Sequence, residues 1–206
     1  MVTPQLDLDR LVAESFLAAA EHYALIHSTN DRAKEAAAAP AELPLLIVAD
    51  SQTAGRGRGA NRWWTGRGSL AVSLLADPAR WCVDMRRDAA DLSLAAAQAV
   101  ARTVNARLPE ELPAEVHPPN DVYVGQRKLA GILIEGLGDG LLVVGIGLNT
   151  NNTLADAPPE LLRTATTLRE LLERPVDPTE LLIDLLAHLD AALFLVGSAR
   201  MSKWSG

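Results

Sequence analysis

A loop rich in glycine and arginine is the feature that most constrains how this sequence folds. Between residues 52 and 70 the chain reads QTAGRGRGANRWWTGRGSL, which holds five glycines and four arginines. Apolar runs at residues 45–49 and 70–75 flank this segment, and both are typical of buried strands. The two strands are therefore expected to form a hairpin whose long loop carries a binding site.

The charge of this loop contrasts with that of the whole chain. The formal net charge is -7, yet no Asp or Glu occurs between residues 51 and 76. Glycine lets backbone N–H groups approach a ligand, and arginine offers a fork of donors suited to carboxylate and phosphate, so we expect a small anionic or adenylated ligand. A disordered nucleic-acid tail and a loop without function are the alternatives. Apolar flanks and the adjacent indoles of Trp63 and Trp64 argue against both.

Length and composition predict one domain. The 206 residues, 49% of them hydrophobic, suffice for a compact unit with its own core. The single cysteine, Cys82, excludes an internal disulfide, and the sequence contains neither a signal peptide nor an 18-residue apolar run. We therefore expect a soluble, cytoplasmic protein. The acidic net charge also argues against nonspecific DNA binding.

Hydrophobic periodicity predicts three main helices, at residues 8–20, 91–108 and 179–196. The last of them carries a leucine stripe that is typical of a core helix. His188 lies beside this stripe and is interpreted as a structural or surface histidine rather than a catalytic one.

A polar triplet stands at the start of another predicted helix. Residues 23–27 are interpreted as a short strand, and Ser28, Thr29 or Asn30 is expected to cap the helix that follows. The same side chains are also suited to read the polar edge of a ligand, because the unpaired N–H groups of a helix start lie close by.

The second half of the chain predicts a meander of three antiparallel strands. Residues 122–124 and 127–134 have β character, and Gly125-Gln126 between them fits a type II′ turn with glycine first. A further turn at residues 138–140 leads into LLVVGIGLN.

Polar residues in this meander are candidates for ligand contacts. Lys128 lies near a hairpin turn in an otherwise apolar segment, where an exposed lysine without function is the alternative. Asn120 and Asp121 either start a turn or bind a ribose or a metal-bridged phosphate. Asn149 follows glycines that admit a ligand close to the backbone, and its amide suits adenine or phosphate.

Five motifs stand in order along the chain: STN (28–30), QTAGRGR (52–58) with Trp63, PND (119–121), RKLAGILIE (127–135) and GIGLNTN (145–151). Together they resemble the catalytic domain of biotin protein ligases, the enzymes that attach biotin to acetyl-CoA carboxylase and related carrier proteins. The segment TATTLRE at residues 164–170 resembles the next part of the family. The resemblance implies an α+β fold with a mixed, mainly antiparallel sheet flanked by helices, related to class II aminoacyl-tRNA synthetases and lipoate ligases.

The resemblance also implies a reaction and its residues. Biotin and Mg-ATP give biotinyl-5′-adenylate and pyrophosphate, and a lysine of a biotin carboxyl carrier domain then takes the biotinyl group. Cations aimed at the α-phosphorus would stabilise the developing charge. The implied catalytic residues are Arg56, Arg58 and Lys128. The implied biotin-binding residues are Ser28, Thr29, Asn30, Gln52, Gly55, Arg56, Gly57, Arg58, Lys128, Gly131 and Leu133. ATP would contact Arg58, Trp63, Asn120, Asp121, Lys128 and Asn149, with Asp121 as a Mg²⁺ ligand.

The chain departs from the family pattern at two places. His117-Pro118 stands where family members usually carry Lys-Trp, which replaces a permanent charge by an imidazole and an aromatic wall by a proline. After Arg58, a less basic Gly59-Ala60-Asn61 follows. Both departures leave open how tightly ATP and the adenylate are held.

We expect a minimal, monofunctional ligase. The catalytic domain is placed at residues 1–198 and a short tail at 199–206, without an N-terminal winged helix, a C-terminal β-barrel or a membrane association. An exposed sheet edge leaves a homodimer open. The alternatives are a lipoate-type acyl ligase and a degenerate, noncatalytic biotin- or nucleotide-binding protein. The GRGR loop with Gln52 disfavours the first, and the retained Arg56, Arg58 and Lys128 disfavour the second.

Overall fold

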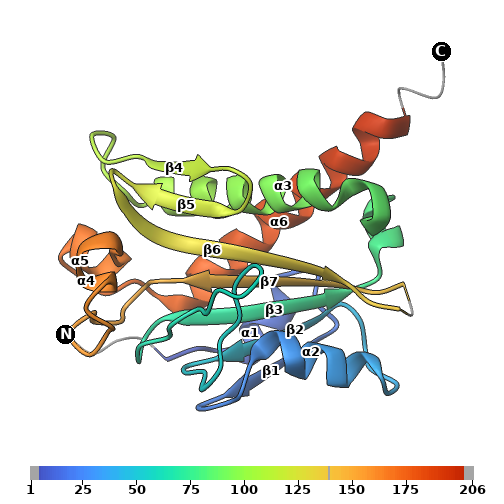
Figure 1. The fold of residues 1–206 in the computed structure, drawn as a ribbon. Coiled ribbons are helices and arrows are strands. Elements are labelled where there is room, and N and C mark those ends of the chain that lie inside the picture. Colours follow the sequence, from blue (N-terminus) through green and yellow to red (C-terminus); the bar gives the residue numbers. More distant parts are fainter. Residues whose placement is uncertain (1–4, 139, 202–206) are drawn as a thin grey trace.

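The computed structural model describes residues 5–138 and 140–201 and confirms the expected α+β class. A seven-stranded sheet has the order β1-β2-β3-β7-β6-β5-β4; β1 and β2 pair in parallel and the other neighbours are antiparallel (Figure 1). The strands are β1 (Ala19–Tyr23), β2 (Leu45–Ala49), β3 (Leu70–Ala76), β4 (Ala114–His117), β5 (Asp121–Val124), β6 (Arg127–Gly136) and β7 (Leu142–Leu148).

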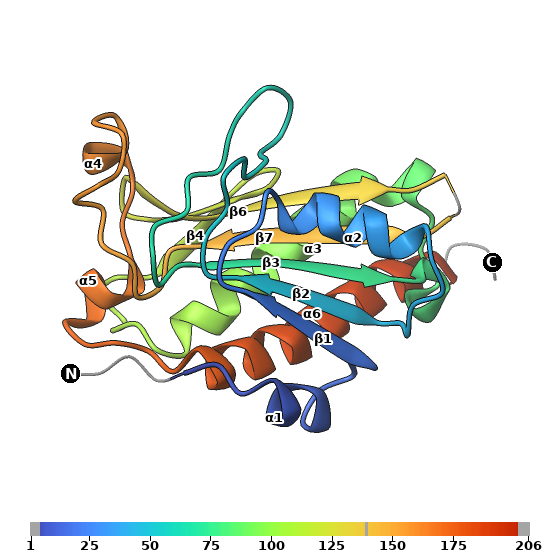
Figure 2. The same ribbon diagram turned by 90° about the horizontal axis from the view of Figure 1, so that it is seen from below.

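Helices cover both faces of the sheet. Figure 2 shows α2 on one face and the long pair α3 and α6 on the other. Side chains alternate along β2, so that Leu46 and Val48 join the large core beneath α3 and α6, whereas Leu45 and Ile47 pack on the α2 side with Ala33. The helices are α1 (Leu8–Ala13), α2 (Thr29–Ala37), η1 (Pro78–Trp81), α3 (Met85–Asn105), α4 (Leu161–Thr164), α5 (Leu168–Leu172) and α6 (Pro178–Met201).

The leucine stripe of α6 lies in the core as predicted, with Leu182, Leu185 and Leu193 buried. By length and composition, α6 is also apolar enough to cross a membrane, but core helices of soluble proteins pass the same test. Of the apolar 18-residue segment of α6 that meets this test, 39% is buried within the protein. The helix extends to Met201 and so includes the first residues of the predicted tail. Residues 202–206 lie outside the described part.

The hairpin of β2 and β3 and the meander of β5, β6 and β7 are confirmed. Gly125 has a φ of 58°, as the first position of the predicted type II′ turn requires. Of the turn predicted at residues 138–140, Asp139 lies outside the described residues. The strand β4 was not predicted; it adds a fourth strand to the meander.

Two predicted boundaries near the N-terminus are wrong. The helix expected at residues 8–20 ends at Ala13, and the strand expected at residues 23–27 is β1, Ala19–Tyr23. Pairing of β1 with β2 accounts for both corrections, since it places Ala19 opposite Leu45. The start of α3 also differs: Asp84 caps it, so that Met85 rather than Asp91 is its first residue.

Candidate functional site

A cavity of about 320 Å³ lies on the α2 side of the sheet, above strands that carry small residues. Ala71 of β3, Gly147 of β7 and Gly131 of β6 stand in one row of the register. Ser73 and Gly145 stand opposite one another in the next row. These small side chains leave space above the backbone, and the cavity lies in that space.

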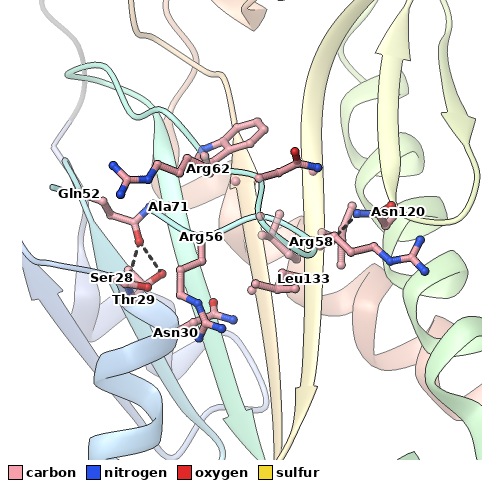
Figure 3. A pocket seen from close by; sticks show the side chains of 18 of the residues that line it. Ser28, Thr29, Asn30, Gln52, Arg56, Arg58, Arg62, Ala71, Asn120 and Leu133 are labelled. Atoms are coloured by element: carbon pink, nitrogen blue, oxygen red, sulfur yellow. Dashed lines mark hydrogen bonds between the residues drawn. The ribbon is translucent and has the colours of Figure 1, made fainter. Parts of the chain in front are cut away.

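Hydrogen bonds organise one end of the cavity (Figure 3). Gln52 Oε1 accepts from Thr29 N at 2.8 Å and from Thr29 Oγ1 at 3.2 Å. Ser73 Oγ lies 2.8 Å from Thr29 Oγ1 and 2.6 Å from Asn30 Oδ1. Ser28 caps α2 by accepting from Asp31 N, and it lines the cavity together with Thr29 and Asn30. The interpretation of Ser28 as a helix cap is confirmed, and the place of the triplet in the cavity wall fits the prediction that it contacts a ligand.

The glycine- and arginine-rich loop folds back on itself as a short hairpin beside the cavity. Gly57 N donates to Asn61 O at 2.9 Å, and Trp63 N donates to Gly55 O at 3.0 Å. A Cβ at Gly55 would lie 2.3 Å from Trp63 O, so a side chain at this position would collide with the backbone. Gly57 lines the cavity, whereas Gly55 supports the loop from outside it.

Three arginines of the loop, Arg56, Arg58 and Arg62, line the cavity, and the first two differ in their partners. Arg56 Nη1 lies 3.0 Å from Asp31 Oδ1, and Arg56 Nη2 lies 3.0 Å from Glu135 Oε1. Arg58 forms no ion pair with any described residue, and Figure 3 shows it extending toward Asn120. The charge of Arg58 is thus available to a ligand, whereas that of Arg56 is shared with two carboxylates.

A β-bulge brings Lys128 to the cavity. The register of β5 and β6 shifts so that Tyr123 stands opposite Lys128, after Val122 opposite Ala130. Leu129 and Ala130 both lie in the hydrophobic core, which breaks the alternation of side chains. The extra residue therefore returns the side chain of Lys128 to the cavity face, as bulges commonly do near binding sites.

Lys128 has a carboxylate and an indole as neighbours. Its Nζ lies 2.7 Å from Asp121 Oδ1 and 5.8 Å from the ring of Trp63. This ion pair lacks hydrogen-bond geometry, so Asp121 Oδ1 is buried without a hydrogen bond to the described residues. Trp63 Nε1 is also buried without such a hydrogen bond. Because Asp121 and Trp63 both line the cavity, buried polar atoms without a hydrogen bond are typical here of a site that a ligand completes.

A second cavity of about 140 Å³ adjoins the first. Arg62, Trp63 and Lys128 line both cavities. Trp64, Tyr123 and Asn149 line the second only, so of the predicted biotin residues only Lys128 shares a cavity wall with Asn149. The His117 ring stacks on the Tyr123 ring with centroids 4.2 Å apart, which places the departure from the family pattern beside this cavity.

The prediction that Asp121 binds Mg²⁺ stays a prediction. Residues 5–138 and 140–201 contain no group of three or more His, Cys, Asp or Glu side chains that could hold a metal. A nucleotide-bound Mg²⁺ needs only one or two carboxylates, because phosphate oxygens and water complete its shell. Asp121 lines the cavity and fits that mode of binding, with Lys128 Nζ beside its Oδ1.

Sequence reasoning missed Ser73 and Glu135. Ser73 is the one polar residue in the buried strand LAVSLLA, and this was a usable signal. Glu135 ends the motif RKLAGILIE, but its partners Asn30 and Arg56 are distant in the sequence. Gly131 and Leu133, which are predicted to bind biotin, line the cavity.

A comparison with known families gives the decisive finding. The biotin/lipoate A/B protein ligase family matches residues 23–151. The chain belongs to this family. The matched range contains all five motifs and every described residue that lines the first cavity.

Curated members of the biotin/lipoate ligase family include similar proteins. The biotin–[acetyl-CoA-carboxylase] ligase of Mycobacterium tuberculosis is 36% identical over 171 residues, which are 81% of this chain and 60% of that protein. The bifunctional ligase/repressor BirA of Bacillus spizizenii is 32% identical over 158 residues, which are 74% of this chain. The chain spans about half the length of BirA, 47%.

Solved structures of similar proteins share the fold. The biotin protein ligase of Aquifex aeolicus, in complex with biotin and ATP, matches with a TM-score of 0.73 at 30% identity, over 86% of this chain and 71% of that one. A biotin protein ligase-like protein of unknown function from Silicibacter sp. matches at 16% identity with a TM-score of 0.59, over 90% of this chain and 71% of that one. The latter likeness concerns the fold alone.

Proposed function

We propose that this protein is an ATP-dependent biotin protein ligase, which forms biotinyl-5′-adenylate and transfers the biotinyl group to a lysine of a biotin carrier domain. The observation that carries the proposal is that the first cavity has an uncharged polar end and a positively charged part of its wall. Thr29, Asn30 and Gln52 give one end uncharged hydrogen-bonding groups, whereas Arg58 and Lys128 supply unpaired or exchangeable positive charge elsewhere in its wall.

The uncharged end favours biotin over lipoate. A cyclic urea presents one carbonyl acceptor and two N–H donors, whereas a dithiolane ring presents neither. The hydroxyl group of Thr29 and the amide group of Gln52 include both hydrogen-bond donors and acceptors. Polar groups that are built to bind a polar ligand lose free energy when an apolar ligand leaves them unpaired, so this wall selects against lipoate.

In the proposed first step, a carboxylate oxygen of biotin attacks the α-phosphorus of ATP, and the bond to the β-phosphate oxygen breaks to release pyrophosphate. Both reactants are anions, so the step depends on positive charge held in place. Arg58 and Lys128 are the residues proposed for this role. Bound Mg²⁺ would neutralise phosphate charge, with Asp121 and Asn120 as its neighbours in the cavity wall.

In the proposed second step, the neutral amine of a carrier lysine attacks the acyl carbon. The bond between that carbon and the phosphate oxygen breaks, AMP leaves, and the amine proton passes to solvent. The hairpin loop that carries Arg58 would limit the access of water to the mixed anhydride in the meantime. Tyr123 and Trp64 of the second cavity are suited to stack against the adenine.

A noncatalytic binding protein is the second candidate, because of one observation. His117 stacks on Tyr123 beside the proposed adenine site, where related ligases carry Lys-Trp. Loss of that lysine would remove a charge from the proposed ATP side. Biotin binding without adenylate formation is the behaviour that this candidate predicts.

The first experiment measures adenylate formation without any carrier. Purified protein is mixed with Mg-ATP and biotin, and biotinyl-adenylate and pyrophosphate are quantified; lipoate replaces biotin in a parallel reaction. The proposal predicts both products with biotin and little with lipoate. Biotin binding by calorimetry without pyrophosphate release would favour the noncatalytic candidate, and preferential use of lipoate would identify the other ligase class.

A further inference from the structure

We propose that Glu135 is a positioning residue, which holds the Asn30 amide at the polar end of the cavity and anchors the loop through the Arg56 guanidinium. Glu135 does not line the cavity, so it acts through these two residues. The consequence for biotin binding rests on the proposed function, whereas the anchoring of the loop does not.

The contacts of Glu135 use the full capacity of its carboxylate. Oε2 accepts from Asn30 Nδ2 at 2.8 Å and from Arg56 Nη1 at 3.2 Å. Oε1 accepts from Lys34 Nζ at 2.8 Å and lies 3.0 Å from Arg56 Nη2. An ionised carboxylate offers about four acceptor sites, so each contact here has one.

Asn30 takes its orientation from two protein partners. Its Nδ2 donates to Glu135, and its Oδ1 lies 2.6 Å from Ser73 Oγ. The Asn30 amide packs against Gly145, where a Cβ would lie 2.1 Å from Asn30 Oδ1. The amide cannot turn over without placing its oxygen against the Glu135 carboxylate, acceptor against acceptor, so the carboxylate decides which Asn30 atoms a ligand meets.

Arg56 ties the loop to the body of the protein by the same carboxylate. It comes from the loop, Asp31 comes from α2 and Glu135 comes from β6. The Glu135 side chain is 19% exposed and the Arg56 side chain 39%, so the anchor lies partly out of water. The geometry thus gives the Arg56 side chain a role in holding the loop, while Arg58 remains free for the ligand.

The charge of Glu135 suits this role at neutral pH. Burial raises the pKa of the Glu135 carboxyl, but hydrogen bonds from Asn30 and Lys34 and the charges of Lys34 and Arg56 outweigh it, so that the pKa lies below the usual value of 4.5. The carboxylate is therefore ionised throughout the neutral range, and the contacts above are made by a charged acceptor.

The test compares Glu135→Gln with Lys34→Met. Glutamine keeps the shape but turns an NH₂ group toward the donors, whereas Lys34→Met removes a Glu135 contact outside the cavity and the loop. We expect Glu135→Gln to speed hydrogen exchange of the loop amides at residues 55–63 in the ligand-free protein. It should also raise the KM for biotin by about 10-fold or more, as the loss of charged hydrogen bonds implies, while the KM for ATP changes little. Lys34→Met should leave all three measurements close to wild type.

A double-mutant cycle separates positioning from general destabilisation. If Arg56 holds the loop through Glu135, loop exchange in Glu135→Gln combined with Arg56→Met will match that of Arg56→Met alone. Additive effects would overturn the proposal, and so would unchanged loop exchange in Glu135→Gln. Should Glu135→Gln fail to fold, Glu135→Asp, which keeps the charge but shortens the reach, must show the same faster exchange and higher KM for biotin. Hydrogen exchange of the loop amides does not depend on catalysis. If the wild type formed no adenylate, the proposed function would be contradicted, but the exchange measurements would still test the anchoring of the loop.

Discussion

Lys128 Nζ lies 2.7 Å from Asp121 Oδ1, at the boundary between the two cavities. A lysine held there by the β-bulge is placed to stabilise negative charge on both a carboxylate and a phosphate. We predict that Lys128→Ala raises the barrier to adenylate formation by ~2–4 kcal/mol, as the removal of comparable charge-stabilising donors does. Single-turnover formation of biotinyl-adenylate measures the effect.

Arg127→Ala is the matched control for that variant. Arg127 is the preceding residue and pairs with Glu170 away from the cavity, so its removal should leave the rate of adenylate formation nearly unchanged. A near wild-type rate in Lys128→Ala would remove Lys128 from the mechanism.

Arg58→Gly should release biotinyl-adenylate before transfer. Arg58 lines the first cavity without an ion partner among the described residues, so it is free to hold the adenylate. The variant is expected to label bystander lysines on an added non-carrier protein, detected by streptavidin blotting. Arg67→Gly changes an exposed arginine of the same loop that lines neither cavity, and it should stay selective. Equal selectivity of both variants would count against retention by Arg58.

Gly145→Ala should weaken biotin binding without unfolding the protein. The new Cβ would lie 2.1 Å from Asn30 Oδ1 and displace that amide. Titration calorimetry should give a biotin affinity at least about tenfold lower, as expected when a buried hydrogen-bond partner is lost. Gly138→Ala is the control, because nothing lies within 4 Å of its Cβ position. An unaltered biotin affinity in Gly145→Ala would show that Asn30 does not contribute.

We predict that protonation of His188 lowers the stability of the protein in mild acid. Burial lowers its pKa from 6.5, and the charge of Arg102 adds to this effect. The unfolded chain therefore takes up the proton at a higher pH than the folded one, so the free energy of unfolding falls as the pH drops below 6.5. Urea unfolding at several pH values should show a shallower decline for His188→Gln than for the unaltered chain. Identical slopes would assign the decline to other groups.

The sequence predicted the elements that depend on local signals. The apolar run of β2 ends where the charged and glycine-rich loop begins, and Ser28 caps α2 with its own side chain. The helix expected at residues 8–20 failed because alanines favour a helix locally, whereas pairing of Ala19 with Leu45 depends on a strand far along the chain. Tertiary contact overrode propensity at that point.

Within the candidate site, the residues of the ordered motifs were predictable and their mutual contacts were not. The bulge that turns Lys128 to the cavity follows from packing Leu129 and Ala130 in one core, which no period-two pattern indicates. The different partners of Arg56 and Arg58 depend on Glu135, 79 residues away from Arg56. Contacts over such separations appear only in the folded chain.

Transfer of the biotinyl group to a carrier domain is the decisive test of the proposed function. The protein is incubated with biotin, Mg-ATP and a biotin carrier domain, and the mass of the carrier is followed beside reactions that lack ATP or use a carrier whose target lysine is replaced by arginine. We predict the mass increase of one biotinyl group in the complete reaction and in neither control. A carrier of unchanged mass, under conditions in which a related ligase modifies it fully, would contradict the proposed function.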